Sequence, residues 1–421
     1  MVRRYFGTDG VRGIVGEELT SELVERLGRA AALWSGGGKV FVGRDTRASG
    51  PMLEDAFAEG VASAGGHAVL GGVLPTPAVA LLALDLGAVI SASHNPPQYN
   101  GVKFFDSQGC KLTDASEEEI EALLDAPARA ERGSIDRVGV AADSYTEHII
   151  DRFGSDLSGL RIAVDCANGA YSGIAPEALE RLGAAVERLG DRPDGENINV
   201  RCGATDLSAL RGAVIEAGCG LGVAFDGDGD RVLAVGETGE TVDGDQILAI
   251  LALHLKVDVV VVTVMTNLGF HRLMADHGIR VVTTSVGDRY VVEALRQEKA
   301  ILGGEQSGHI ICLDGHVTGD GLAAALLLCQ AIDGRTLGEA ASGMRRFAQA
   351  KENLSVRIRE LPDDLIREVE AVNRDLDGEA RILVRLSGTE PLVRILAEAP
   401  GEEEAAALCA TITALVRREL G

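Results

Sequence analysis

Three aspartates that alternate with glycine carry the strongest chemical signal in the chain. They are Asp226, Asp228 and Asp230, in the segment VAFDGDGDRVLAV. Carboxylate oxygens suit Mg²⁺ or Ca²⁺, and the glycines allow the tight turn that brings the three side chains together. An EF-hand loop is the alternative, because Glu237 falls at its twelfth position, but Arg231 stands where that loop needs a glycine and the flanking segments read as strands. The pattern therefore predicts a divalent cation site.

A second motif, RLSGTEP, places an arginine just before a serine-glycine-threonine turn. Arg385, Ser387, Gly388 and Thr389 would together offer a guanidinium, two hydroxyls and exposed backbone N–H groups. This set of donors suits a phosphate group. For this motif taken alone, an ordinary turn is the alternative.

Two further segments deliver polar side chains into short loops. GGEQSGH places Glu305, Ser307 and His309 after two glycines, a mixture that suits the hydroxyl and amine groups of a sugar, although His309 could equally be structural. In GAVISASHNPPQYNGVKFF an apolar strand ends at Ser93, and the next apolar segment carries Lys103. Because α/β sheets bind ligands beyond the carboxyl ends of their strands, Ser93 is a candidate nucleophile.

Several common enzyme classes lack their signatures in this sequence. There is no GxSxG elbow, GGGK at positions 36–39 lacks the spacing of a Walker loop, and GCGLG at positions 218–222 is not a dinucleotide fingerprint. The remaining set is a serine, a divalent cation site, a sugar-like loop and a phosphate cradle. This combination indicates phosphoryl transfer on a sugar.

The elements that must position these loops repeat three times. KVFVGRDTRASG, RIAVDCANGAYSG and VDVVVVTVMTNLG each read as an apolar strand and a polar loop, followed by a helix, a glycine and another strand. This alternation predicts three similar mixed α/β domains, and the tail predicts a smaller α+β domain. The expected domains cover residues 1–143, 144–243, 244–348 and 349–421, with the serine, metal, sugar and phosphate loops in that order.

The composition narrows the partners and the location. The 421 residues carry a formal net charge of −24, which would repel nucleic acids and anionic membranes, so we expect neither as a partner. No apolar run is long enough to span a bilayer, and the N-terminus lacks the core of a signal peptide. The seven cysteines are scattered without a CxxC pair, which favours reduced thiols and a cytoplasmic protein.

The motifs, taken in order, resemble those of the α-D-phosphohexomutase family. RYFGTDGVRG, SASHNPPQYNGVKFF, DGDGDR, VGDRYV, GEQSGH and RLSGTEP together span essentially the whole chain. The resemblance implies four domains around a central cleft, the last of a different fold. It also implies an Mg²⁺-dependent enzyme with a phosphoserine, which interconverts small-molecule phosphosugars and uses a sugar 1,6-bisphosphate as intermediate or activator.

The same resemblance assigns roles to residues. Ser93 becomes the phosphoserine and binds Mg²⁺ together with the three aspartates, while Lys103 and His309 become the candidates for proton transfer. The other implied positions are Arg12 and Arg231 near the phosphoserine, Gly287, Arg289, Glu305 and Ser307 at the substrate, and Arg385, Ser387, Gly388 and Thr389 at the non-reacting phosphate.

Two branches of this family differ in the sugar phosphate that they use as substrate. Gln306 in GEQSGH, and the segment VGDRYV, resemble the phosphoglucosamine mutase branch, which interconverts glucosamine 6-phosphate and glucosamine 1-phosphate. NPPQYNG, and Leu386 in RLSGTEP, resemble the phosphomannomutase/phosphoglucomutase branch instead. We expect the glucosamine reaction, with mannose or glucose phosphates as the alternative substrates, and a monomer or a homodimer.

Overall fold

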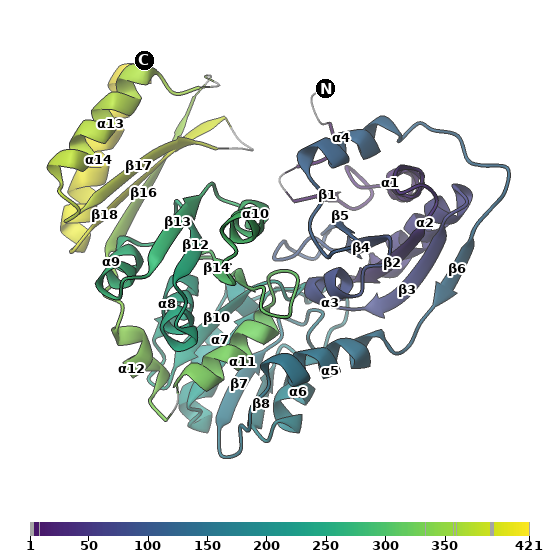
Figure 1. Ribbon diagram of the computed structural model, residues 1–421, viewed down its shortest axis with the longest axis horizontal. Helices are drawn as coiled ribbons and strands as arrows, with labels where there is room; N and C mark the ends of the chain where they lie inside the picture. Colours follow the sequence, from purple (N-terminus) through teal and green to yellow (C-terminus); the bar gives the residue numbers. More distant parts are fainter. Residues whose placement is uncertain are drawn as a thin grey trace. The chain divides into compact units, whose positions relative to one another are not determined.

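The computed structural model describes residues 4–7, 9–332, 334–356, 358, 360–387 and 391–420. They belong to two units, and each is described here by itself (Figure 1). The larger unit comprises Met1–Met265 and Ile279–Ser342. The smaller unit comprises Thr266–Gly278 and Gly343–Gly421.

The first sheet of the larger unit has the strand order β1-β5-β4-β2-β3-β6. Strand β4 is buried along its whole length, as its continuous apolar sequence requires. It runs parallel to β2 and antiparallel to β5, and Val89 lies opposite Lys103. The strands are β1 (Val11–Ile14), β2 (Lys39–Arg44), β3 (His67–Val73), β4 (Leu86–Ile90), β5 (Tyr99–Asp106) and β6 (Ser134–Arg137), and the helices are α1 (Ser21–Trp34), α2 (Gly50–Ser63), α3 (Thr76–Leu81) and α4 (Asp114–Ala122).

The second sheet has the order β11-β10-β9-β7-β8. Strands β9 and β10 form an antiparallel pair in which Phe225 lies opposite Val232, so the segment 226–231 is the loop between them. The elements are α5 (Ala141–Phe153), β7 (Arg161–Asp165), α6 (Ala175–Arg181), β8 (Ala185–Leu189), the 3₁₀ helix η1 (Gly203–Thr205), α7 (Ser208–Ala217), β9 (Leu221–Phe225), β10 (Val232–Gly236) and β11 (Thr241–Val242).

The third sheet has the order β13-β12-β14-β15. Strands β14 and β15 are antiparallel, and Gly304 lies opposite Ile310, which leaves 305–309 as their connecting loop. The elements are α8 (Gly244–Leu255), β12 (Val259–Thr263), β13 (Arg280–Thr284), α10 (Asp288–Glu298), β14 (Leu302–Gly304), β15 (Ile310–Cys312), α11 (Gly321–Ile332) and α12 (Leu337–Ser342).

One strand order recurs in all three sheets. The sets β3-β2-β4-β5, β8-β7-β9-β10 and β13-β12-β14-β15 each consist of three parallel strands followed by one antiparallel strand. The threefold α/β pattern expected from the sequence is thereby confirmed. The serine, metal and sugar loops all occupy the same place in this order, between the third parallel strand and its antiparallel neighbour.

The smaller unit is an antiparallel sheet, β16-β18-β17, with helices α13 and α14. Its core is built from apolar side chains such as Ile395 and Val416, on β18 and α14. This confirms the different, smaller C-terminal fold. The elements are α9 (Leu268–Asp276), β16 (Ala348–Ser355), α13 (Asp363–Asp375), β17 (Arg381–Leu386), β18 (Leu392–Ala399) and α14 (Glu402–Leu420).

Two general features bear on the sequence-based expectations. Among the described residues, no helix combines the length and the apolar character that crossing a bilayer requires. All seven cysteines are free thiols, and only Cys110 is not fully buried.

Candidate active site

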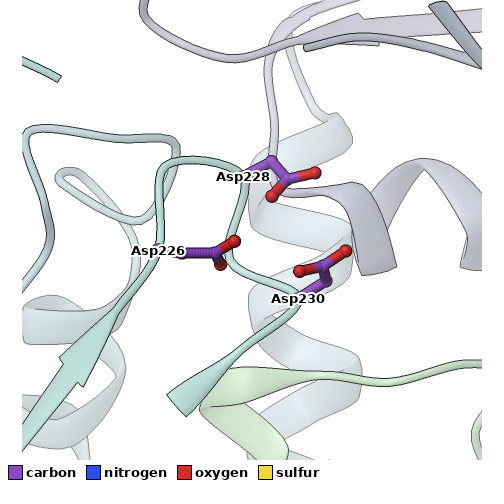
Figure 2. A group of neighbouring side chains, drawn as sticks. All are labelled: Asp226, Asp228 and Asp230. Atoms are coloured by element: carbon purple, nitrogen blue, oxygen red, sulfur yellow. The ribbon is translucent and has the colours of Figure 1, made fainter. Parts of the chain in front are cut away.

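The three aspartates of the β9–β10 loop point into one small buried space (Figure 2). One carboxylate oxygen from each of Asp226, Asp228 and Asp230 lies within 4.8 Å of the others. Within the described part of the chain, the Oδ1 atoms of Asp228 and Asp230 are buried without a hydrogen-bond partner. Buried acceptors are normally satisfied, and a hard divalent cation would satisfy these oxygens. The residues therefore fit Mg²⁺.

The two glycines of this loop are required by close approaches. A Cβ atom on Gly227 would lie 2.7 Å from the carbonyl oxygen of Ser93. Gly229 has a φ of +77°, and a Cβ there would lie 2.4 Å from the ring of Tyr171. The alternation of aspartate and glycine thus follows from packing on both sides of the loop, as well as from the turn itself.

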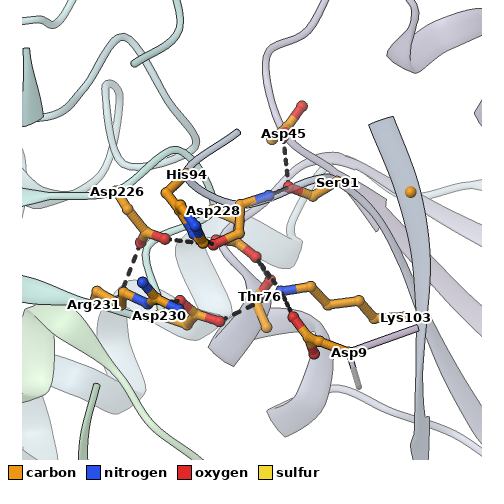
Figure 3. Close-up of polar contacts among 12 residues, drawn as sticks. Asp9, Asp45, Thr76, Ser91, His94, Lys103, Asp226, Asp228, Asp230 and Arg231 are labelled. Atoms are coloured by element: carbon orange, nitrogen blue, oxygen red, sulfur yellow. Dashed lines mark hydrogen bonds and ion pairs between the residues drawn. The ribbon is translucent and has the colours of Figure 1, made fainter. Parts of the chain in front are cut away.

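Ser93 lies beyond the end of β4 and contacts Asp226 of the metal loop. Figure 3 shows the polar side chains gathered at this loop, among them Asp226, Asp228 and Lys103. Ser93 donates a hydrogen bond of 2.6 Å from its Oγ to Oδ2 of Asp226, and its side chain is almost fully buried. Its backbone is left-handed, with a φ of 54°, an uncommon conformation for a residue with a Cβ. Its N–H donates to Oγ of Ser91 at 2.9 Å. The structure thus brings the candidate nucleophile against the candidate cation site.

Lys103 lies on β5 and joins the same cluster. Its Nζ is 2.8 Å from Asp228 and 3.1 Å from Asp9. Burial would lower the pKa of this ammonium group, but the charges of Asp228, Asp9 and Asp230 raise the pKa above its ordinary value. Thr76 also donates to Oδ2 of Asp228, at 2.6 Å. Lys103 therefore neutralises part of the charge of the metal loop.

Alternating charges continue from Lys103 through all three sheets of the larger unit. Asp9 pairs with Lys111 at 2.6 Å, and Lys111 pairs with Asp288 at 2.6 Å. Asp288 lies 3.4 Å from Nε2 of His309, whose Nδ1 lies 3.7 Å from Asp230. Burial would lower the pKa of His309, but these two carboxylates raise it. The ring of charges closes at the metal loop.

A histidine contacts Ser93, and the charges of two arginines, Arg231 and Arg12, act on that histidine. The backbone N–H of Arg231 donates to Oδ1 of Asp226 at 3.1 Å, and its Nε lies 3.9 Å from Asp230. Arg12, on β1, pairs with Asp9. Burial and the charges of Arg231 and Arg12 lower the pKa of His94 to about 4, so its imidazole is neutral near pH 7. Its Nδ1 lies 3.3 Å from Oγ of Ser93.

The predicted substrate residues of the third sheet lie in different places. Glu305 is half-buried in the β14–β15 loop, where burial raises the pKa of its carboxyl group, and Ser307 is exposed. Gly287, with a φ of 133°, precedes α10. Arg289 pairs with Asp114 at the start of α4, and its Nη1 donates to the carbonyl of Leu112. Its neighbour Asp288 lies in the motif VGDRYV but was not singled out from it, and it belongs to the ring of charges.

The predicted phosphate loop lies in the smaller unit. Arg385 is opposite Arg394 on the neighbouring strand, and burial together with the Arg394 charge lowers the pKa of Arg385. Like charges placed directly opposite are unfavourable, so this pair favours an anion. Ser387 follows β17 and its N–H donates to the carbonyl of Leu392. Gly388 and Thr389 lie outside the described residues.

Sequence reasoning missed several residues of this site. Asp9 and Lys111 belong to the charge ring, Thr76 bonds to the metal loop, and a buried arginine, Arg47, lies beside the Ser93 loop. Asp9 and Arg47 stand in the glycine-containing segments GTDG and GRDTR, the one local signal that could have drawn attention to them. Their partners are far away in the chain.

Models of four domain families match nearly the whole chain. They are described as phosphoglucomutase/phosphomannomutase, alpha/beta/alpha domain I at residues 3–131, domain II at 143–239, domain III at 243–347, and C-terminal domain at 340–415. The chain belongs to the α-D-phosphohexomutase family. Within that family it is most similar to proteins named phosphoglucosamine mutase.

Individual relatives agree with this membership. The phosphoglucosamine mutase of Moorella thermoacetica is 47% identical, with 95% of this chain and 96% of the relative covered. That of Thermobifida fusca is also 47% identical, with 99% of both chains covered. A solved phosphoglucomutase/phosphomannomutase family protein from Burkholderia thailandensis has a TM-score of 0.84 at 26% identity, and covers 99% of this chain and 96% of its own.

A substitution of nearly equal volume tests the cation site. Burial and the neighbouring aspartate charges raise the pKa of Asp226 well above its usual value, so an ionised Asp226 is unfavourable in the metal-free protein, and Asp226→Asn should leave that form at least as stable as the wild type. Excess Mg²⁺ should stabilise the wild type by about 2.7 kcal/mol at a hundred times its Kd, and this gain should largely disappear in the variant. Thermal unfolding with and without Mg²⁺ measures both. The exposed Asp55→Asn is the control, and an undiminished response of Asp226→Asn would contradict the assignment.

A pair of glycine substitutions separates backbone strain from loop geometry. Gly229 and Gly72 have nearly equal φ values, +77° and +76°, but a Cβ at Gly72 would meet nothing within 4 Å. Changing either to alanine should cost about 1–2 kcal/mol from the left-handed backbone. Gly229→Ala alone should also weaken the Mg²⁺-induced shift in Tm, because its methyl group displaces the loop from Tyr171. Equal Mg²⁺ responses would show that this packing does not shape the cation site.

Proposed function

We propose that this protein interconverts glucosamine 6-phosphate and glucosamine 1-phosphate. One observation carries the proposal: the hydroxyl of Ser93 is hydrogen-bonded to Asp226 beside two more buried carboxylates. A serine in this position can carry a phosphoryl group next to a divalent cation. The choice of sugar is supported by the phosphoglucosamine mutases that are 47% identical over 95% or more of the chain.

In the proposed reaction, phosphorylated Ser93 is attacked by the C1 hydroxyl of glucosamine 6-phosphate. The bond between Oγ and phosphorus breaks as the bond from O1 to phosphorus forms, which gives the 1,6-bisphosphate and an unphosphorylated serine. After the bisphosphate has turned over, Ser93 attacks the phosphorus at position 6. This returns the phosphoryl group to the enzyme, leaves a hydroxyl at C6, and releases glucosamine 1-phosphate. Bound Mg²⁺ would neutralise charge on the transferring group.

The residues of the chain supply positioning and proton transfer. We assign the cation to Asp226, Asp228, Asp230 and an oxygen of phosphorylated Ser93. Lys103 and His309 are both candidates for proton transfer, because each lies at the metal loop that Ser93 contacts. The carboxylates beside them favour their protonated forms, so either would have to release a proton before it could take one from the attacking hydroxyl. A positioned acid or base contributes roughly 10²–10⁴ in rate. Arg12 and Arg231 would hold the charge of the phosphoryl group near Ser93.

Further residues are assigned to the substrate and its phosphate groups. We propose that four residues contact the sugar as it enters the site and binds: Gly287, Arg289, Glu305 and Ser307. The segment from Arg385 to Thr389 would bind the phosphate that does not react, with Arg394 as a further cation. Both phosphates must use that segment in turn, which favours hydroxyl and backbone donors over one rigid ion pair.

A second substrate class has support of its own. A putative phosphomannomutase from Thermus thermophilus has a TM-score of 0.81 at 28% identity, with 98% of both chains covered, and NPPQYNG resembles that branch. We keep mannose and glucose phosphates as the alternative substrates. For the location we propose the cytoplasm, on the strength of the seven free thiols.

Removal of the Ser93 hydroxyl is the direct test of the phosphoserine role. Ser93→Ala should reduce mutase turnover to background, because no atom remains to carry the phosphoryl group, while the protein keeps its fold and its Mg²⁺-induced gain in Tm. Ser63→Ala, a hydroxyl that bonds within α2, should remain fully active. Substantial turnover by Ser93→Ala would show that another group carries the phosphate.

A comparison of three substrates tests the choice of sugar. The proposal predicts that kcat/KM for glucosamine 6-phosphate exceeds the values for glucose and mannose 6-phosphates by at least about tenfold, or about 1.4 kcal/mol in transition-state binding. Coupled assays with one preparation of fully phosphorylated enzyme give the three values. A preference for mannose or glucose phosphate would move the protein to the other branch and leave the reaction type unchanged.

A further inference from the structure

The loop that carries Ser93 surrounds a fully buried arginine. Arg47 follows β2 and has no exposed surface. Its Nε donates to Oδ2 of Asp45 at 2.9 Å, and its backbone N–H donates to Oδ1 of the same carboxylate at 3.0 Å. Oγ of Ser91 also donates to Oδ2 of Asp45, at 2.5 Å. Asp45 is thus the acidic partner of Arg47.

The remaining donors of Arg47 all reach backbone carbonyls of this loop. Nη2 donates to Ser93 at 2.9 Å and to Asn95 at 2.8 Å. Nη1 donates to Pro96 at 2.5 Å and to Tyr99 at 3.0 Å. A guanidinium has five N–H donors, and here all five have an acceptor. No other common side chain presents five donors in a rigid plane.

A second side chain, that of Asn199, donates to two of the same carbonyls. It belongs to the segment of the chain that forms the second sheet. Nδ2 of Asn199 donates to the carbonyl of Ser93 at 2.8 Å and to that of Asn95 at 3.2 Å. Asn199 has a φ of 59°, and asparagine tolerates that conformation better than most residues. Gly227 of the metal loop packs against the Ser93 carbonyl from the same side. The Ser93 carbonyl therefore accepts hydrogen bonds from both Arg47 and Asn199.

We propose that Arg47 and Asn199 are positioning residues that hold Ser93 in its left-handed conformation and set its hydroxyl against Asp226. A left-handed backbone at a residue with a Cβ persists only where its surroundings enforce it. Rotation of the peptide after Ser93 would move Oγ away from the metal loop, and a displacement of about 1 Å can cost 10²-fold in rate. The consequence for turnover rests on the proposed function.

The alternative is that Arg47 only stabilises the fold. Both explanations predict a lower Tm when Arg47 is changed, so stability does not separate them. Two other readouts do: kcat compared with KM, and hydrogen exchange at the amides of Ser93 and Asn95. These amides donate within the loop, to Ser91 and Ala92. A rise in their exchange that the core amides of β4 do not share reports opening of the loop itself, whereas a loss of global stability alone speeds the exchange of both sets.

The experiment compares Arg47→Lys and Asn199→Gly with Arg26→Met. Lysine keeps the positive charge beside Asp45 but lacks the planar fork, and glycine removes the amide of Asn199 while tolerating the positive φ. Arg26 lies in the same domain and also bonds one carbonyl and one aspartate, Leu124 and Asp125, but it does not touch the Ser93 loop. Kinetics are measured with sugar 1,6-bisphosphate present, and exchange without substrate.

For Arg47→Lys we expect kcat to fall about 100-fold while KM changes little, and the two loop amides to exchange about tenfold faster or more. Asn199→Gly should show a smaller change in the same direction, and Arg26→Met should leave kcat and the loop amides unchanged. Wild-type kcat and exchange in Arg47→Lys would overturn the proposal. If Arg47→Lys does not fold, Asn199→Gly decides in the same way.

The exchange measurement also separates this proposal from the proposed function. If the wild type turned over no phosphosugar, the proposed function would fail. Faster exchange of the Ser93 and Asn95 amides in the variants would still support the clamp on the loop, and unchanged exchange would still overturn it.

Discussion

Three carboxylates share one buried space, and their mutual repulsion is the constraint on which the rest of the site depends. Two unit charges 4.8 Å apart repel by about 3.5 kcal/mol at an effective dielectric constant of 20. Lys103 offsets part of this repulsion but is shared with Asp9, and His309, in its protonated form, is shared with Asp288 in the same way. The result is a ring of charged and polar groups in which two carboxylate oxygens of the triad still have no hydrogen-bond partner among the described residues. A bound divalent cation would neutralise the excess negative charge and would contact these two oxygens.

The repeated sheet order explains how such a cluster can form. In each domain the functional loop leaves the third parallel strand and enters an antiparallel neighbour, so three loops of one design carry the serine, the carboxylates and the histidine. Hydrogen bonds then hold the metal loop in place between the other two loops. The backbone N–H of Val232 donates to Gly308 of the sugar loop, and the N–H groups of Gly321 on α11 and Thr76 on α3 donate to Gly229 and Asp228. The serine loop joins the metal loop through the bond from Oγ of Ser93 to Asp226.

Local patterns were enough to predict much of this. Three aspartates within five residues predict a cation site. The repeated order of strand, loop and helix predicts the three α/β domains. Long-range pairing was not accessible in the same way: Arg47 reaches carbonyls 46 to 52 residues away, and Lys103 meets Asp228 across 125 residues. The direction in which a side chain points could not be predicted from these patterns either. Successive residues on a helix differ by about 100° in direction, so at the start of α10 Asp288 joins the charge ring while Arg289 pairs with Asp114.

The central claim is that Ser93 carries the phosphoryl group between two sugar positions. The most direct measurement is peptide mass spectrometry of the wild-type protein after treatment with a sugar 1,6-bisphosphate, and again after brief exposure to glucosamine 6-phosphate. We expect one phosphoryl group on Ser93 after the first step and its transfer to the sugar in the second, with glucosamine 1-phosphate as the product. Turnover with no phosphate on Ser93, or with phosphate on another residue, would contradict the claim.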